Sequence, residues 1–106
     1  MEINEWVERC YRNAEEHGFI DQYRTFGHDI ALVHSELSEA LLAYRSEEPF
    51  FYVTEEGTPE GVAVELADAV MRIMTICGER GIDLEEVMER KYVYNRERPF
   101  LHGKRF

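Results

Sequence analysis

The sequence predicts an all-α protein. Apolar residues recur at the i, i+3, i+4, i+7 spacing through most of the chain, which is typical of amphipathic helices. Residues that start and stop helices divide this pattern into four segments, and the only strand-like stretch is short and solitary. At 106 residues the chain is long enough for one hydrophobic core and too short for two, so residues 1–106 are expected to form a single domain.

The first two helices are defined by their apolar spacing. The first is expected to begin near Asn4, a possible N-cap, and to end at Gly18. The second runs to Arg45 and starts near Gln22 or Asp29, since a glycine at position 27 could break it or be tolerated. The apolar positions of the first helix are Ile3, Trp6, Val7, Cys10, Tyr11 and Ala14.

The third and fourth helices have clearer boundaries. In the third, Thr58 is a plausible N-cap with Pro59 at the first helical position, and Gly78 or Gly81 closes the helix. In the fourth, Asp83 can accept a hydrogen bond from the backbone of residue 86 in a variant of the capping box. Pro99 stops this helix.

The segment at residues 50–54 has strand-like composition. A loop fixed by its aromatic side chains is favoured over a small β-hairpin. Any pairing partner is expected to be the same segment of another subunit.

The formal net charge of −10 argues against a partner with a phosphate backbone or an anionic membrane surface. It allows a small anionic ligand, provided that a cation offsets the repulsion. No signal-peptide pattern or transmembrane stretch is visible, and Cys10 and Cys77 are isolated at helical core positions. A cytoplasmic protein with two buried, reduced thiols is therefore expected.

Glu36 breaks the apolar pattern of the second helix. At about 100° per residue, its side chain falls near the middle of the apolar arc, and Glu39 falls at the edge. An ionised carboxylate in a core must be paired, protonated or bound to a metal ion. Two interpretations stay open: a buried ion pair with an arginine, or a metal site.

The third helix carries a matching pair of acids. Glu65 and Asp68 lie three residues apart in its narrow polar stripe, as Glu36 and Glu39 do on the second helix. Four carboxylates converging from adjacent antiparallel helices would need a cation, and their hard oxygens suit Mg²⁺ or Mn²⁺. A solvated polar stripe is the alternative.

The fourth helix breaks its pattern with the opposite charge. Lys91 and Asn95 continue its apolar face, and Arg98 lies beside them. These residues could simply neutralise the carboxylates, or they could line a site for a phosphate or a base.

These motifs resemble the MazG-like family of all-α nucleoside triphosphate pyrophosphohydrolases. The family signature is EExxE followed by ExxD about two dozen residues later. Glu36 and Glu39 match the second and third acids, and Glu65 and Asp68 match ExxD after 25 intervening residues. The ending K-x3-N-x2-R also matches. Ser35 stands in place of the first glutamate, and the similarity covers roughly residues 28–104.

The resemblance implies a bundle of four to five helices, completed by oligomerisation, that hydrolyses an NTP or dNTP to the monophosphate and pyrophosphate. It implies that Glu36, Glu39, Glu65 and Asp68 hold Mg²⁺, for which Mn²⁺ is a possible substitute. Glu39 is the candidate general base. The residues implied in substrate binding are Lys91, Asn95, Arg98 and Lys104.

The apolar surface of the third helix independently predicts a homodimer or homotetramer. Two alternatives to the pyrophosphohydrolase are a phosphoribosyl-ATP pyrophosphatase-like enzyme and a non-catalytic, metal-binding helical interaction module. Aromatic residues that could stack on a base are Trp6, Tyr11, Tyr23 and Phe26, although a position in the core is the favoured interpretation for each.

Overall fold

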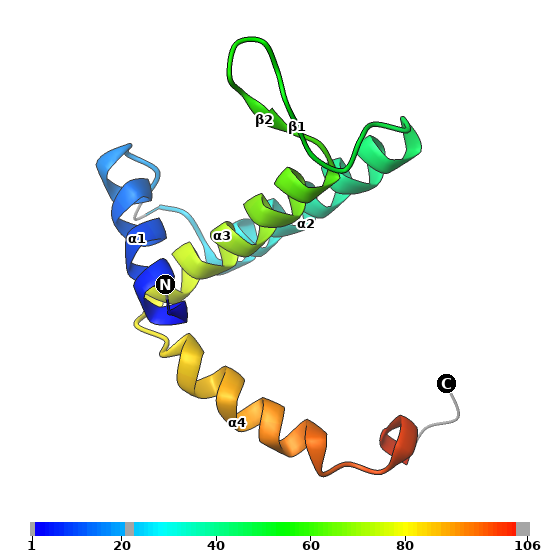
Figure 1. Ribbon diagram of the computed structural model, residues 1–106. Helices are drawn as coiled ribbons and strands as arrows, with labels where there is room; N and C mark the ends of the chain where they lie inside the picture. Colours follow the sequence, from blue (N-terminus) through cyan, green and yellow to red (C-terminus); the bar gives the residue numbers. More distant parts are fainter. Residues whose placement is uncertain (1, 21–22, 104–106) are drawn as a thin grey trace.

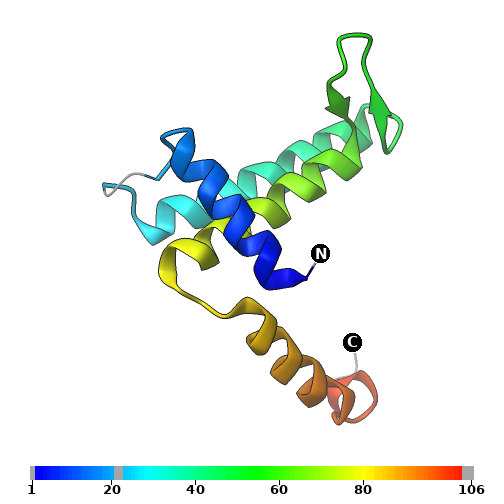
Figure 2. The same ribbon diagram turned by 60° about the vertical axis from the view of Figure 1, so that its left-hand side comes forward.

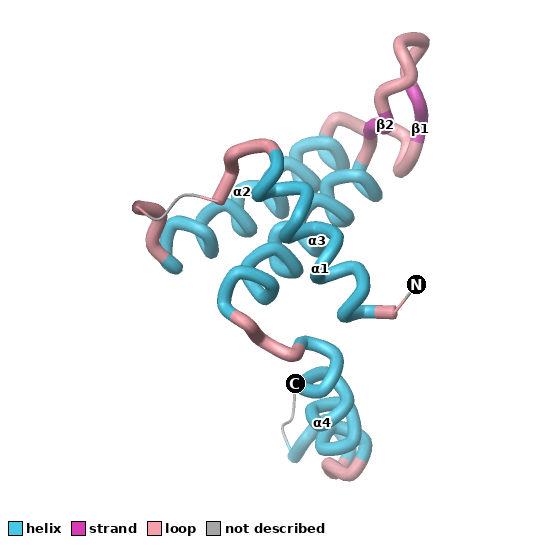
Figure 3. Tube along the Cα trace, turned by 90° about the vertical axis from the view of Figure 1, so that its left-hand side faces the viewer, coloured by secondary structure: helices cyan, strands magenta, loops and turns pink. Residues whose placement is uncertain are grey.

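The computed structural model describes residues 2–20 and 23–103. The described chain is mostly helical, which confirms the all-α class, with one two-stranded hairpin (Figure 1; Figure 3). The elements in chain order are α1 (Ile3–Glu16), α2 (Phe26–Arg45), β1 (Tyr52–Val53), β2 (Pro59–Glu60), α3 (Val62–Arg80), α4 (Leu84–Arg96) and the 3-10 helix η1 (Phe100–Gly103).

Helices α2 and α3 lie side by side and antiparallel, and α1 crosses α3 near its C-terminal end (Figure 1; Figure 2). Small residues fill the α2–α3 contact, including Ala40, Ala43 and Ala69. A second buried cluster joins α1 to α3 and contains both cysteines, which are free thiols as the sequence predicts. The core is therefore centred on α3.

The two N-terminal helices begin at residues that differ from the predicted ones. The N-cap of α1 is Glu2, not Asn4; the Asn4 side chain instead donates to Asp83 Oδ1 at 2.9 Å. Helix α2 begins at Phe26, between the two predicted starts, because the Thr25 hydroxyl accepts from the backbone N–H of His28. The alternative start at residue 22 lies outside the described residues. For Asn4, the long-range hydrogen bond to Asp83 thus outweighs the residue's local preference for a capping position.

The predicted start of the third helix was wrong. Pro59 belongs to β2, whose partner is β1 of the same chain, with Val53 opposite Pro59. Helix α3 begins only after Gly61, which has φ +110°. A Cβ at Gly61 would lie 2.6 Å from the carbonyl oxygens of both Pro49 and Phe50, so this tight junction requires glycine. The expected loop is therefore a hairpin, and it pairs within the chain.

Helix α4 leaves the rest of the molecule at a sharp turn. Gly81 closes α3 in the left-handed conformation at φ +66°, and Asp83 caps α4 by accepting from the Glu86 backbone N–H, as predicted. Contacts between α4 and the other helices are concentrated on α1, where Leu84 packs against the α1–α3 core. Beyond this anchor α4 extends away from the α2–α3 pair (Figure 1).

The chain is more open than a compact domain of its length. Its radius of gyration is 16.5 Å, whereas a compact domain of this length has about 13 Å. Among the described residues, no large side chain is fully buried, and apolar side chains of α2 and α3 such as Leu41 and Val70 are about half exposed. No helix in the described part of the chain is long and apolar enough to span a membrane.

Candidate functional site

Three of the four predicted acidic residues meet between α2 and α3. Glu36 on α2 and Glu65 and Asp68 on α3 each offer a carboxylate oxygen, and these three oxygens lie within 4.8 Å of one another. The spacing of three residues puts Glu65 and Asp68 on one face of α3, and the antiparallel packing brings Glu36 against that face. We call these three residues the acidic cluster.

The acidic cluster resists full ionisation. Burial is the main cause that raises the pKa of Glu65, followed by a hydrogen bond with Glu36 and by repulsion from neighbouring carboxylates. Burial also raises the pKa of Asp68, with a further contribution from the charge of Glu36, while Arg72 opposes the shift. The metal-free cluster therefore favours a proton, or another cation, among its oxygens.

Arg72 forms an ion pair with the acidic cluster. Its Nε donates to Glu36 Oε1 at 2.8 Å, and the Glu36 side chain is only 14% exposed. The arginine ion pair considered from the sequence is therefore present, and it coexists with the convergence of carboxylates. One arginine bears one positive charge against three acidic groups, so the pair does not by itself neutralise the fully ionised cluster.

Glu39 is not part of the acidic cluster. It is exposed on α2, one turn after Glu36, yet it lies close enough to Glu65 for its charge to raise the pKa of that residue. A carboxylate at this position can accept a proton from water without being a ligand of the same ion.

The donor set of the acidic cluster fits a hard divalent cation. All three side chains offer carboxylate oxygens, which Mg²⁺ and Mn²⁺ prefer, and no sulfur or imidazole ligand belongs to the group. Burial is the main cause of the raised pKa values of Glu65 and Asp68, and a divalent cation would offset the carboxylate repulsion that adds to it. Three ligands leave coordination positions for water or for a substrate.

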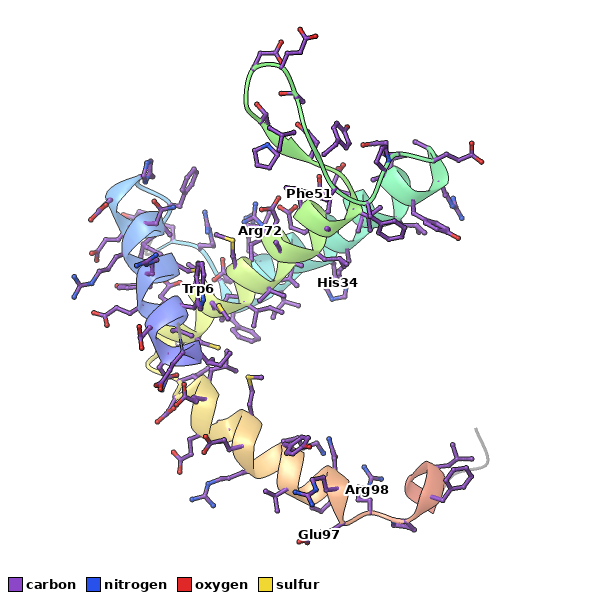
Figure 4. All side chains as sticks on the ribbon, in the orientation of Figure 1. Trp6, His34, Phe51, Arg72, Glu97 and Arg98 are labelled. Carbon is purple, nitrogen blue, oxygen red and sulfur yellow. The ribbon has the colours of Figure 1, made fainter. Side chains whose placement is uncertain are left out.

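A cavity of about 580 Å³ adjoins the acidic cluster. Glu36, Asp68 and Arg72 form part of its lining, and α1 contributes Trp6 and Asn13. Figure 4 shows Trp6 extending from α1 towards α3. The cavity is thus bounded by carboxylates in one part and by an aromatic side chain in another, a mixture of polar and apolar lining that is typical of small-molecule sites.

The aromatic candidates do not gather at one place. Trp6 lines the large cavity, whereas Tyr11 lines a smaller one beside Gly78. The Arg80 guanidinium lies over the Phe26 ring, 4.7 Å from the centroid of that ring. Tyr23 is exposed and does not line the large cavity. Trp6 is therefore the candidate for contact with a base.

The sequence did not lead us to predict a buried acid in the cavity wall. Asp29 is only 7% exposed and pairs with Arg24, with 3.5 Å between Nη1 and Oδ1. Both residues line the cavity. Asp29 precedes Glu36 by seven residues and so lies on the same face of α2. That spacing was the signal that could have identified it.

Three of the predicted phosphate-binding residues lie on α4 or just after it, away from the acidic cluster. Lys91 Nζ lies 4.7 Å from the Tyr94 ring centroid, and the Arg98 guanidinium lies 5.5 Å from the same centroid. Asn95 Oδ1 is buried without a hydrogen-bond partner. Figure 4 shows Arg98 near the far end of α4 and Arg72 on α3. Within one chain, Lys91, Asn95 and Arg98 are therefore separated from the acidic cluster. The fourth predicted residue, Lys104, lies outside the described residues.

Comparisons with protein-family models, curated proteins and solved structures gave no match to this chain. The case for a function therefore depends on the chemistry of the residues described above.

Proposed function

We propose that the protein is a Mg²⁺-dependent nucleotide pyrophosphohydrolase, which converts an NTP or dNTP and water to the monophosphate and pyrophosphate. The observation that carries this proposal is the convergence of Glu36, Glu65 and Asp68 beside a cavity of about 580 Å³. The resemblance of the sequence to the MazG-like signature supports the same reaction.

In this proposal the acidic cluster holds the cation, and the cavity takes the rest of the nucleotide. A bound Mg²⁺ would act as a Lewis acid and offset the charge on the leaving pyrophosphate. Glu39 accepts the proton of the attacking water, for which its exposure and its position outside the cluster suit it. Trp6 lies against the base or the sugar. The water oxygen bonds to one phosphorus of the α–β bridge, the bond between that phosphorus and the bridging oxygen breaks, and the bridging oxygen leaves with the other product.

We further propose that the active enzyme is a homodimer or a pair of homodimers. Apolar side chains of α2 and α3 are half exposed to water, and a partner surface would bury them. The open shape of the chain leaves room for such a partner. A second copy would also bring opposite charges together. Its α4 carries Lys91 and Asn95, and Arg98 follows that helix, so all three could reach the acidic cluster of the first copy. Asn95 Oδ1 is buried without a hydrogen-bond partner, and a donor from the second copy would satisfy it.

Hydrolysis assays with a panel of NTPs and dNTPs test the reaction, with pyrophosphate and orthophosphate measured separately. We expect pyrophosphate release that requires Mg²⁺ and that falls at least about a hundredfold in Glu36→Gln. Glu56→Gln, an identical change in the exposed hairpin turn, should retain activity. If no nucleotide is cleaved with Mg²⁺ or Mn²⁺ while the metal still binds, the protein is better described as a metal-binding interaction module. The Arg72–Glu36 ion pair would then be purely structural.

A mixing experiment tests the proposed contribution of the second copy. Glu36→Gln and Arg98→Gln should each be nearly inactive. When the two variants are unfolded and refolded together, half of the dimers are mixed and each has one intact site, so about a quarter of wild-type activity should return. No recovery in a mixture that demonstrably contains heterodimers would show that Arg98 does not act across the interface.

A further inference from the structure

Arg72 joins the acidic cluster to the cavity. It follows Asp68 by four residues on α3, so one helical turn separates the two side chains. Its Nε donates to Glu36 Oε1 at 2.8 Å, and the residue also lines the cavity of about 580 Å³. The Arg72 side chain is 41% exposed, whereas that of Glu36 is 14% exposed. The arginine is therefore held at Nε by a largely buried carboxylate, and the rest of its side chain remains accessible from the cavity.

Most of the donors of this guanidinium are unused. An arginine side chain has five N–H groups in a planar fork, and only the one on Nε is engaged by a protein acceptor in the described part of the chain. The Nη groups thus remain available to a ligand. Two parallel N–H donors of a fixed fork match the oxygens of a phosphate, with which arginine commonly forms paired hydrogen bonds.

The other two arginines of the cavity wall are placed differently. The Arg9 guanidinium lies over the Trp6 ring, 5.7 Å from its centroid, and Arg24 pairs with Asp29. Neither of them has an ion pair with the acidic cluster among the described contacts. Arg72 alone of the three is held where the phosphates of a nucleotide would lie if a cation bound to the cluster bridged them.

We propose that Arg72 is a phosphate-binding residue of the substrate site, positioned by Glu36. Glu36 Oε1 holds Nε, which leaves the second oxygen of Glu36 for the cation and the Nη groups of Arg72 for the phosphate oxygens. The same carboxylate thereby fixes the distance between the cation and the guanidinium. This inference rests on the proposed function, because it takes the ligand of the cavity to be a nucleotide phosphate.

Calorimetric binding of inorganic pyrophosphate in the presence of Mg²⁺ tests the role of Arg72 without requiring turnover. Wild-type protein is compared with Arg72→Gln, Arg72→Lys and, as a matched control, Arg9→Gln. Loss of paired, charge-assisted hydrogen bonds should weaken pyrophosphate binding by about ten- to a hundredfold in Arg72→Gln. Arg72→Lys should lose most of the same affinity, because a lysine retains the charge without the fork. Arg9→Gln should bind as the wild type does.

Titration with Mg²⁺ alone separates phosphate binding from a role in holding Glu36. The affinity of the Arg72 variants for Mg²⁺ should be equal to that of the wild type or higher, since a nearby positive charge is lost or unchanged. Wild-type affinity for pyrophosphate in both Arg72 variants would overturn the inference, as would a loss of Mg²⁺ affinity that accounts for the whole effect. If the wild type hydrolyses nucleotides and only the variants behave unexpectedly, the inference fails alone. If the wild type binds Mg²⁺ but neither binds pyrophosphate nor cleaves nucleotides, the proposed function fails with it.

Discussion

Substitution of Gly78 by alanine probes the crossing of α1 over α3, which forms one wall of the cavity. A Cβ on Gly78 would lie 2.6 Å from Tyr11 Cβ and 3.1 Å from Tyr11 Cγ. Since carbon atoms in contact prefer about 3.5–4.0 Å, α1 would have to retreat by roughly 1 Å. Such overpacking costs about 1–3 kcal/mol. The higher helix propensity of alanine returns up to about 1 kcal/mol.

The net loss in the free energy of unfolding for Gly78→Ala should therefore be about 1–2 kcal/mol. For a domain of this size we expect the melting temperature to fall by roughly 5–10 °C. Thermal unfolding followed by circular dichroism with a metal chelator measures this change. Gly27→Ala is the control, because its Cβ would find its nearest neighbour only at 3.9 Å, and its melting temperature should be unchanged or higher. A Gly78→Ala protein as stable as Gly27→Ala would refute the described packing of α1 on α3.

Three further predictions concern the hairpin, the acidic cluster and the thiols. Gly61→Ala should lower the melting temperature more than Gly57→Ala, because both glycines have positive φ but only Gly61 is crowded by backbone atoms; equal losses would contradict this. In metal-free protein, Glu65→Gln should raise the denaturant midpoint at pH 7. Because the pKa of Glu65 is raised in the folded protein, protonated Glu65 stabilises the fold at low pH, and this stabilisation is lost as the pH rises through that pKa. The stability advantage of Glu65→Gln should therefore shrink towards pH 5. A stability difference that does not change with pH would argue against the pKa shift. Cys10 and Cys77 are buried with raised pKa values, so a thiol reagent should modify them only at the rate of unfolding, and rapid labelling of the native protein would contradict their burial.

The sequence predicted those parts of the fold that depend on local patterns. Apolar periodicity located the four helices, and the Asp83 cap was correct because its hydrogen bond spans only three residues. The Thr58–Pro59 start of α3 failed because a tertiary interaction outweighed local propensity. Pro59 pairs with Val53 of β1, the Thr58 carbonyl accepts from the Thr54 backbone N–H, and α3 begins only after Gly61. Asn4 failed as a cap for a similar reason, since its side chain bonds to residues about eighty positions away.

The candidate site was predictable to the extent that it violates the binary pattern. Glu36 stood out as a carboxylate within an apolar arc, and its convergence with Glu65 and Asp68 follows from antiparallel helices with matched spacing. The pairing of Arg72 with Glu36 depends on the relative rotation of α2 and α3, which periodicity does not fix. The direction of α4 depends on a single turn at Gly81, so the separation of Lys91 and Arg98 from the carboxylates could not be foreseen.

Titration of metal-free protein with Mn²⁺ or Mg²⁺ is the most direct test of the central claim that the acidic cluster holds a divalent cation. We expect saturable binding in the wild type that is lost or greatly weakened in Glu65→Gln and Asp68→Asn, while Glu56→Gln binds normally. Each loss should remove one of three carboxylate ligands and part of the negative charge that attracts the ion. Absence of saturable binding in the wild type, or equal binding in the cluster variants, would contradict the claim.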